Sequence, residues 1–382
     1  MQIIDRYLLR QYVQTFLICF VSLTGLYIVI DAFTHLEDFI KCAEATGEGL
    51  GSLMGHYYAY QSLFFFDMTS GMLALIAGMF TITWIQRHNE LTAIMAAGIP
   101  RIRVMKPIIA AAVAIAVIAM ANRELVIPCF RNELSRKSTD LAGDSAQELQ
   151  PRYDNQTDIL IRGQSTFAAE QRISHPSFLM PGELDSLGNQ LVAEEAFFKP
   201  AKGDRPAGYL LMGVSQPKKI DTLPSLTLPS TGERVIVTRH DEPDWLKPNE
   251  CFMVSNVTFD QLSSSGDWKQ YASTFQLIRS LRNPSLGYSA DMSVAIHSRI
   301  LHPFLDMTLL FLGMPLVLSK GNRNVFVAIG LCMLVVSFFV LVTLVLQSLG
   351  ASYLLISPAL AAWAPLMLFV PVAVGMAGTM WE

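Results

Sequence analysis

The chain has 382 residues, of which 52% are hydrophobic and 16% are charged. An average soluble domain contains more charged and fewer apolar residues, so this composition predicts a membrane protein. The formal net charge of −4 gives no basic surface field, which excludes nucleic acid as an expected partner.

The first predicted membrane span follows a short basic stretch at the N-terminus. Residues 11–30 are uncharged and long enough to cross a bilayer, and their apolar part is too long for a cleavable signal peptide. Arg6 and Arg10 place the N-terminus in the cytoplasm by the positive-inside rule. Residues 35–61 then combine several carboxylates with glycines, which predicts a short exterior loop.

Two further spans are predicted before the composition changes. The second covers residues 62–85, and the third covers residues 107–122, which are rich in alanine, isoleucine and valine. The connection between these spans begins at Arg87 and ends in a group of cations. The cations after the connection are Arg101, Arg103 and Lys106. The positive-inside rule therefore places the connection in the cytoplasm.

Residues 89–98 of this connection predict a short amphipathic helix. Its apolar side chains recur at positions i, i+3 and i+4, Asn89 can cap its start, and Gly98 followed by Pro100 ends it. Glu90 suits the positive N-terminal end of such a helix. The apolar face lies either against the membrane and the ends of the chain's own spans, or in a groove of a separate motor protein. The residues that would couple to a motor are Arg87, Glu90, Leu91, Ile94, Met95 and Gly98.

A large exterior domain is predicted from residue 123 to residue 300, between membrane halves at 1–122 and 301–382. It contains no run long enough to span a bilayer. Short alternating or β-branched segments separated by turn signals predict an all-β sandwich or jellyroll. The segments cover residues 159–161, 190–198, 209–214, 234–238 and 251–259. Residues 268–282 then regain a helical pattern that ends at Asn283-Pro284.

Three more spans are predicted after this domain. The fourth covers residues 301–319 and is followed by a basic turn at 320–323, which marks the cytoplasm. Residues 324–380 carry no charge, and a break at 347–357 divides them into two spans. The sequence thus predicts an α-helical membrane protein with six transmembrane helices and an inserted all-β, jellyroll-like domain.

Two carboxylates lie inside predicted spans, where a charge is costly. Asp67 and Asp306 each lie near the outer end of a span, so both either face a common cavity or sit near the headgroups, hydrated or paired with Lys41, Arg299 or His302. An ion-coupled secondary transporter that uses both aspartates is the alternative function. Its usual marks, broken midplane helices and inverted repeats, are not visible in the sequence.

Motifs for catalysis or cofactors are not found in the sequence. No G-x-x-x-x-G-K-[ST] loop is present, so the chain is not expected to hydrolyse ATP, and no G-x-S-x-G or H-E-x-x-H pattern indicates a hydrolase. The five cysteines have no metal-ligand spacing, so we expect no metal and no cofactor. Whether two of Cys42, Cys129 and Cys251 form a disulfide is left open, because sequence does not show their proximity.

Several short motifs, in order and spacing, resemble the YjgP/YjgQ permeases, the family of the LptF and LptG subunits of the lipopolysaccharide exporter. These motifs are Asp5-Arg6-Tyr7, Arg87-x-x-Glu90-Leu91 through Gly98 to Pro107, Glu124-Leu125-Val126-Ile127-Pro128, Pro303 through Gly313-Met314-Pro315-Leu316, and Pro358 through Ala361-Ala362-Trp363-x-Pro365. Together they extend over nearly the whole chain. Asp31-Ala32-Phe33, followed by an acidic stretch, is more similar to LptG than to LptF.

The resemblance implies a non-catalytic permease of an ABC transporter in the bacterial inner membrane. It implies a second permease, a cytoplasmic ATPase dimer whose groove receives the connecting helix at Glu90, and a periplasmic lipid-bridge protein that receives the extracted lipid. The chain departs from the family in having Leu366 after Pro365 and few cations near the outer end of its first span, where Lys41 is the clear one. The candidates for the lipid cavity are Asp31, Lys41, Asp67 and Asp306. A third possible function, that of a membrane-anchored scaffold, would require neither the connecting helix nor the two aspartates.

Overall fold

The computed structural model describes most of the chain. The described residues are 3–47, 49–134, 147–167, 170–182, 188–202, 205–228, 232–242, 244–262, 268–283, 290–318, 325–352 and 356–381. The basic turn at 320–323 lies outside these ranges.

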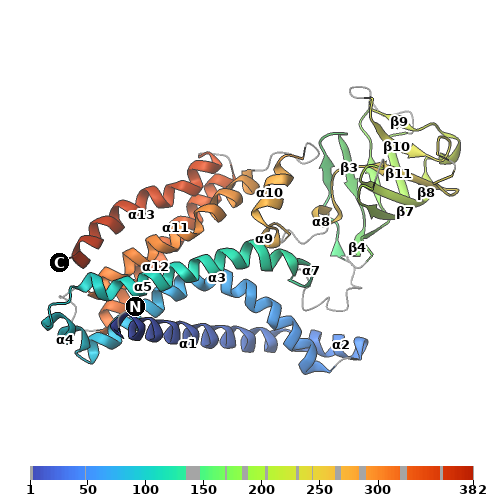
Figure 1. Cartoon of the computed structure of the whole chain (residues 1–382). Helices are drawn as coiled ribbons and strands as arrows, with labels where there is room; N and C mark the ends of the chain where they lie inside the picture. The colour runs from blue at the N-terminus through green and yellow to red at the C-terminus, as the bar shows by residue number, and fades with distance from the viewer. Residues whose placement is uncertain are drawn as a thin grey trace.

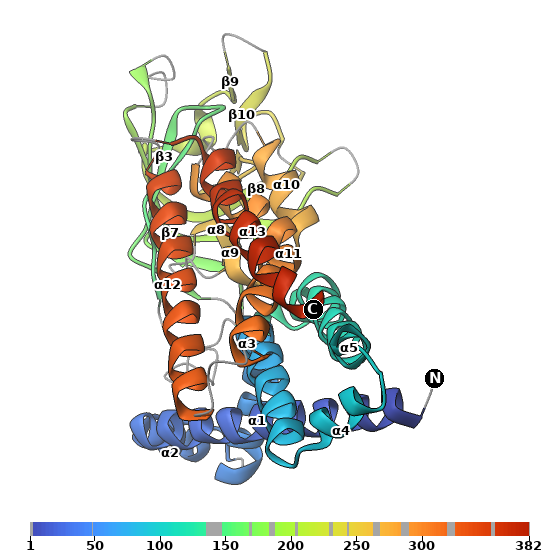
Figure 2. The ribbon, with the colours of Figure 1, turned by 90° about the vertical axis from the view of Figure 1, so that its left-hand side faces the viewer.

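Six helices of the described chain are long and apolar enough to cross a membrane, as the sequence predicts. They are α1 (Ile3–Thr34), α3 (Leu50–Arg87), α5 (Arg101–Ala121), α11 (Ala290–Leu318), α12 (Val325–Ala351) and α13 (Pro358–Trp381). Figure 1 shows them as an elongated bundle, with both chain termini at one end and a β domain beyond the other. We call these the α4 end, after the short helix α4 (Glu90–Ala96) on the side that faces the viewer in Figure 2, and the β-domain end.

The prediction of a loop at residues 35–61 is wrong, because this segment is helical. Helix α2 (Leu36–Thr46) ends at Gly47, and α3 already begins at Leu50. Phe39 of α2 is fully buried and packs on the rings of Tyr57 and Tyr58 at centroid distances of 5.4 and 5.9 Å. This aromatic packing outweighs the low helix propensity of the glycines in the segment.

The bundle packs around α3, which contacts α1, α5 and α11. Its buried side chains join those of the neighbouring helices in one apolar cluster that includes Leu75, Ile108 and Met314. Within this cluster Tyr12 is fully buried, and its hydroxyl donates a hydrogen bond to the Ala74 carbonyl over 3.0 Å. A buried phenol needs such a partner, so this bond fixes α1 against α3.

The chain leaves the bundle through a widened helix. Helix α5 continues without a break into a π-helical turn, η1 (Asn122–Val126), and then into α6 (Ile127–Cys129) and α7 (Arg131–Leu134). Single π-helical turns are often found at functional positions. The third helix is thus longer than the predicted span in both directions.

The insertion between the third and fourth long helices is an antiparallel β domain, which confirms the predicted fold class. Its strands are β1 (Gln147–Glu148), β2 (Arg152–Asp154), β3 (Ile159–Arg162), β4 (Ser165–Phe167), β5 (Arg172–Ser174), β6 (Ser177–Leu179), β7 (Gln190–Lys199), β8 (Gly208–Gln216), β9 (Leu226–Thr227), β10 (Arg234–Thr238) and β11 (Glu250–Val254). Their order is β1-β4-β5-β7-β8-β11-β10-β9, and β2, β3 and β6 branch from β7. A short 3-10 turn, η4 (Ile220–Thr222), lies between β8 and β9.

The central strands of the β domain bury side chains on both faces. Ile236 of β10 is opposite Met253 of β11, and both belong to the main core of the domain. The next pair, Val237 and Phe252, points to the other face and packs with Leu246. Successive side chains of a strand alternate between faces, so this register produces two separate apolar layers.

The end of the β domain differs from the prediction in two places. The strand predicted over residues 251–259 stops at Val254. The next residue turns the chain, because the Ser255 hydroxyl donates to Asp154 over 2.6 Å and accepts from the Val257 N–H. Phe259 then begins helix α8 (Phe259–Leu262). The helix predicted over residues 268–282 is divided into α9 (Trp268–Tyr271) and α10 (Thr274–Leu281). Ser273 and Gln276 form a capping box that starts the second of these helices.

The β8–β11 contact depends on Gly208. A Cβ atom at this position would overlap the Met253 backbone carbonyl and the Phe252 ring, and the carbonyl cannot move without breaking the strand pairing. We expect Gly208→Ala to lower the free energy of unfolding of the β domain by about 1–3 kcal/mol, the usual cost of overpacking. Thermal unfolding in detergent micelles, followed by tryptophan fluorescence, measures this effect. Gly182→Ala, where a Cβ meets no atom within 4 Å, is the matched control and should leave the transition unchanged.

Candidate functional site

The short helix α4 (Glu90–Ala96) lies between α3 and α5 at the end of the bundle that holds both termini (Figure 1). It is shorter than the predicted 89–98. Asn89 precedes it with a φ of 57° and makes no side-chain cap, so this residue provides a turn and not the predicted cap. Gly98 has a φ of 79°, and its N–H and that of Ile99 bond to the carbonyls of Met95 and Ile94. This pairing is a Schellman motif, which requires the left-handed conformation that glycine adopts without cost.

The two faces of α4 have different surroundings. Leu91 and Ile94 are half-buried and pack against a small apolar cluster of Leu8, Ile85 and Val104. These three residues belong to α1, α3 and α5, so α4 is seated on the ends of three long helices. Met95, although only one position from Ile94, is exposed on the outer side.

Exposed residues make up the outer side of α4. They are Thr92, Ala93, Met95 and Ala96, with Arg87 and His88 just before the helix and Ala97 and Gly98 just after it. Within the helix itself, this side consists of small side chains and one methionine. The structure thus separates the predicted coupling residues into an inner pair, Leu91 and Ile94, and an outer group that includes Met95.

Polar contacts hold α4 and its neighbour α5 to the start of α1. The Tyr7 hydroxyl donates to the two Glu90 carboxylate oxygens over 3.0 and 3.3 Å. Asp5 pairs with Arg103 of α5, with an Nη2 to Oδ2 distance of 3.2 Å. All four residues lie in or beside the motifs that carry the family resemblance, and only the structure shows that those motifs touch.

A second polar group lies near the β-domain end of the bundle. Asp67 of α3 and Arg123 of η1 form a buried ion pair of 2.8 Å, and one Asp67 carboxylate oxygen has no hydrogen-bond partner. Asp306 of α11 contacts His302 over 3.2 Å. Asp306 also lies against Gly71 of α3, and a Cβ atom at Gly71 would overlap the Asp306 carboxylate. Gly71 is one helical turn from Asp67. The two aspartates singled out from the sequence therefore lie near one another.

The other two cavity candidates lie apart from this pair. Asp31, near the end of α1, accepts a hydrogen bond from the Tyr58 hydroxyl over 2.9 Å and lies 3.4 Å from His35. Lys41 is exposed on α2. The four residues are thus not gathered in one site. Sequence reasoning missed Arg123 as the partner of Asp67, although it is the first cation after the third span.

The described residues contain no group of three or more His, Cys, Asp and Glu side chains able to hold a metal ion. No disulfide joins the five cysteines, all of which lie in the described part of the chain.

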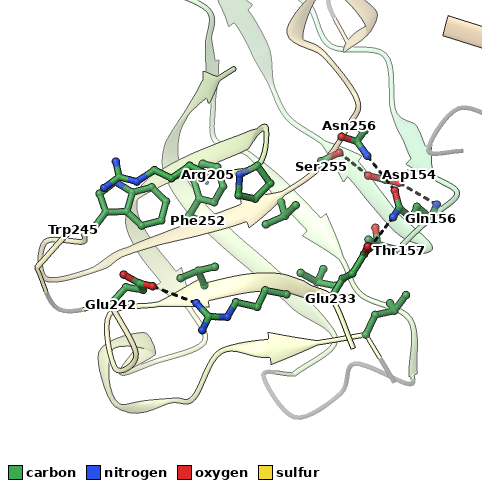
Figure 3. Close-up of a pocket in the computed structure, with 16 residues that line it drawn as sticks. Asp154, Gln156, Thr157, Arg205, Glu233, Glu242, Trp245, Phe252, Ser255 and Asn256 are labelled. Atoms are coloured by element: carbon green, nitrogen blue, oxygen red, sulfur yellow. Dashed lines mark hydrogen bonds and ion pairs between the residues drawn. The ribbon is translucent and has the colours of Figure 1, made fainter. Parts of the chain in front are cut away.

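The β domain has an open pocket with a volume of about 600 Å³ on the face opposite its main core. Figure 3 shows Trp245 and Phe252 on one side of it, with the Arg205 guanidinium stacked 4.4 Å from the centre of the Trp245 ring. The opposite side carries polar groups that bond to one another, with Gln156 donating to Glu233 over 3.1 Å and accepting from Asn256 over 3.1 Å. The pocket is therefore amphipathic.

The membrane bundle has an apolar groove of about 850 Å³ along the contact between α11 and α13. Its lining is apolar apart from Thr308, whose hydroxyl is bonded to the Phe304 carbonyl over 2.8 Å. Phe304 and Trp363 are exposed at this surface. Such a groove suits an acyl chain or an apolar helix and offers no group for polar chemistry.

Comparison with family models identifies the chain. The model described as lipopolysaccharide export system permease LptF/LptG matches residues 6–175 and 230–378, which make up most of the sequence. The chain belongs to the LptF/LptG family. The match includes all six long helices, α4 and η1, and the unmatched residues hold strands β6, β7, β8 and β9 of the β domain.

Membership of the LptF/LptG family makes the chain a non-catalytic permease of the lipopolysaccharide export system. The family model covers LptF and LptG together, so it does not distinguish the two subunits. A search of curated proteins gives no match.

The buried Asp67–Arg123 pair predicts a specific stability effect. Asp67→Asn removes the carboxylate that faces the largely buried Arg123 guanidinium, and leaving such a donor without its partner costs about 1–3 kcal/mol. We therefore expect a clearly lower unfolding temperature for the purified protein in micelles. The double variant Asp67→Asn/Arg123→Gln removes both charges and should recover part of the loss. Unfolding of Asp67→Asn at the wild-type temperature would show that the pair does not stabilise the fold.

Proposed function

We propose that this chain is one of two permeases of an ABC transporter that extracts lipopolysaccharide from the inner membrane and passes it to a periplasmic lipid-bridge protein. The observation that carries the proposal is the family match over all six long helices together with α4, which is seated on three of those helices and keeps an exposed outer side. A closely related lipid is the nearest alternative cargo.

The energy for extraction comes from a separate cytoplasmic ATPase dimer in this proposal. The sequence has no phosphate-binding loop of its own, so ATP must be hydrolysed elsewhere. The outer side of α4, with small residues around Met95, supports docking of this helix in a groove of the ATPase. Because the inner side contacts α1, α3 and α5, a push on α4 reaches three long helices at once.

The distribution of cations supports the orientation. Arg6, Arg10 and Arg87 lie at the α4 end of the bundle, together with the cations that begin α5. The positive-inside rule places this end in the cytoplasm. The β domain, at the opposite end of the bundle, then lies in the periplasm, where it can receive lipid.

The least buried helices support a second permease of the same family. Helix α12 and helix α1 bury only 11% and 17% of their most apolar stretches inside the chain, against 44% for α3. Large side chains such as Ile18 and Val21 on α1 and Leu334 on α12 are more than half exposed. In a bilayer these surfaces contact lipid or another helix bundle, and we assign them to the lipid cavity and the partner permease.

Ion-coupled transport is not part of the proposal. Asp67 is held in direct contact with Arg123, and Asp306 contacts His302, so both carboxylates already have charged or protonatable partners. At the α4 end, Asp5 is likewise paired, with Arg103 over 3.2 Å.

A cation on the outer side of α4 tests the docking. Ala96 is exposed, so Ala96→Arg should leave folding and membrane insertion intact and clash with a bound ATPase. A misplaced charge at an interface weakens the binding free energy by more than about 1.4 kcal/mol, which is a tenfold loss of affinity. We therefore expect co-purification of the ATPase and ATP-driven lipid extraction to fall at least about tenfold. Release of lipopolysaccharide from proteoliposomes to a soluble acceptor is the measurement.

Ala96→Ser is the matched control at the same position and should keep wild-type extraction. Normal extraction by Ala96→Arg would contradict docking through this side of α4. Glu90→Arg should also abolish extraction, because it removes the acceptor of the Tyr7 hydroxyl and so unseats the helix.

A further inference from the structure

The two ends of the β-domain insertion meet at the β-domain end of the bundle. The chain leaves the bundle through η1 and returns through α9 and α10 before α11 begins. Figure 1 shows α9 and α10 beside the end of α11, between the bundle and the β strands. These helices belong to the base of the insertion, and Asn283, which follows α10, donates to the Asn256 carbonyl of the β domain over 2.9 Å.

Glu124 of η1 holds the start of α10. Its carboxylate accepts the Thr274 backbone N–H over 2.9 Å and the Thr274 hydroxyl over 2.5 Å. Thr274 is the first residue of α10, where unpaired N–H groups and the helix dipole favour a negative charge. One side chain on the outgoing segment thus fixes a helix on the returning segment, 150 residues later in the chain.

Arg299 of α11 holds α9 from the other side. Its guanidinium donates to the backbone carbonyls of Lys269 at 2.5 Å and Gln270 at 2.9 Å, and also to that of Ala272. Carbonyls at the C-terminal end of a helix lack intrahelical donors and attract a cation. A planar guanidinium carries five N–H donors on three nitrogens, so it bonds to all three carbonyls at once. A lysine ammonium has its donors on a single nitrogen and does not reproduce this arrangement.

Apolar packing supports both polar contacts. Leu277 of α10 is fully buried with Met292 and Ile296 of α11, and Tyr271 of α9 packs on Phe64 of α3 at a centroid distance of 5.2 Å. Ile127, which follows η1, joins the same group as Tyr271. The base of the β domain therefore contacts α3, η1 and α11 together.

Two neighbouring residues of η1 connect this base to the bundle. Arg123 pairs with Asp67 of α3, and Glu124, the next residue, binds Thr274 of α10. The wider π-helical turn holds these two side chains, so a shift of α3 relative to α5 acts on the segment that grips α10. A buried ion pair and a two-bond cap resist such a shift more than a flexible linker would.

We propose that Arg123, Glu124 and Arg299 form a joint that makes the base of the β domain move with α3, α5 and α11. They are positioning residues, which act through the helices that they hold. In the transport cycle the joint carries the displacement of the membrane helices to the β domain, so that this domain is aligned when lipid leaves the bundle. That second part rests on the proposed function, whereas the joint itself does not.

The joint is tested first in the single chain, without any transport partner. Spin labels at Met68 of α3 and Tyr153 of β2, both exposed, report the distance between the bundle and the β domain in lipid nanodiscs. Wild-type protein should give one narrow distance distribution. Glu124→Gln combined with Arg299→Lys should broaden it, with thermal unfolding used to show that both domains remain folded. An unchanged distribution in this folded double variant would overturn the proposal.

The transport role is tested with the assembled complex. Glu124→Gln should lower lipid transfer by about tenfold while ATP hydrolysis stays within about twofold of wild type, a loss of coupling in the usual range for linked sites. Glu37→Gln, an exposed carboxylate on α2 at the same end of the bundle, is the matched control and should transfer lipid normally. Equal loss of ATP hydrolysis and lipid transfer would contradict a joint that acts after hydrolysis.

The two measurements separate this inference from the proposed function. If the wild-type complex transfers no lipid but the double variant broadens the distance distribution, the joint stands and the proposed function fails. If wild-type transfer is normal and Glu124→Gln transfers lipid at the wild-type rate, the transport role of the joint is contradicted.

Discussion

The seating of α4 on three long helices is the contact on which the functional account depends. An isolated helix of seven residues is not stable in water, so α4 depends on its contacts with the rest of the chain. The cluster with Leu8, Ile85 and Val104, and the Tyr7 to Glu90 hydrogen bond, therefore determine where α4 lies. In the proposed function, a helix fixed in this way passes a displacement on to the long helices.

Helix α3 joins the two ends of the molecule. Ile85 contacts α4 at one end of this helix, and Asp67 binds Arg123 toward the other, about 27 Å away at the rise of an α-helix. The segment between them is closely packed, with Leu73, Leu75 and Met79 nearly inaccessible. A close-packed helix moves as a unit, so α3 can link the α4 contact to the joint at the base of the β domain.

The sequence predicted those features that depend on a long or repeated signal. Six apolar runs gave the six spans, and the alternating segments gave β3, β7, β8 and β10. Very short strands such as β1 and β9 carry no periodicity to detect. Helix α2 was missed because its stability comes from Phe39 packing on two tyrosines of α3, which no local pattern contains.

The candidate site shows the same division. The position of α4, its end at Gly98 and the two aspartates are visible in the sequence. Which side of α4 faces inward is not, because it depends on Leu8 and Val104 from other helices. The Asp67 to Arg123 pair joins residues 56 positions apart, and the Glu124 to Thr274 contact joins residues 150 apart. Contacts between distant residues need the fold.

Labelling of thiols from outside the cell determines whether α4 faces the cell interior. Cys129 is exposed at the β-domain end of the bundle, whereas burial raises the pKa of the Cys251 thiol to about 12 and leaves it unreactive. A membrane-impermeant maleimide added to intact spheroplasts should label Cys129. In a Cys129→Ser background, Met95→Cys should be labelled only after the membrane is opened. Labelling of Met95→Cys in intact spheroplasts would place α4 outside and contradict the account.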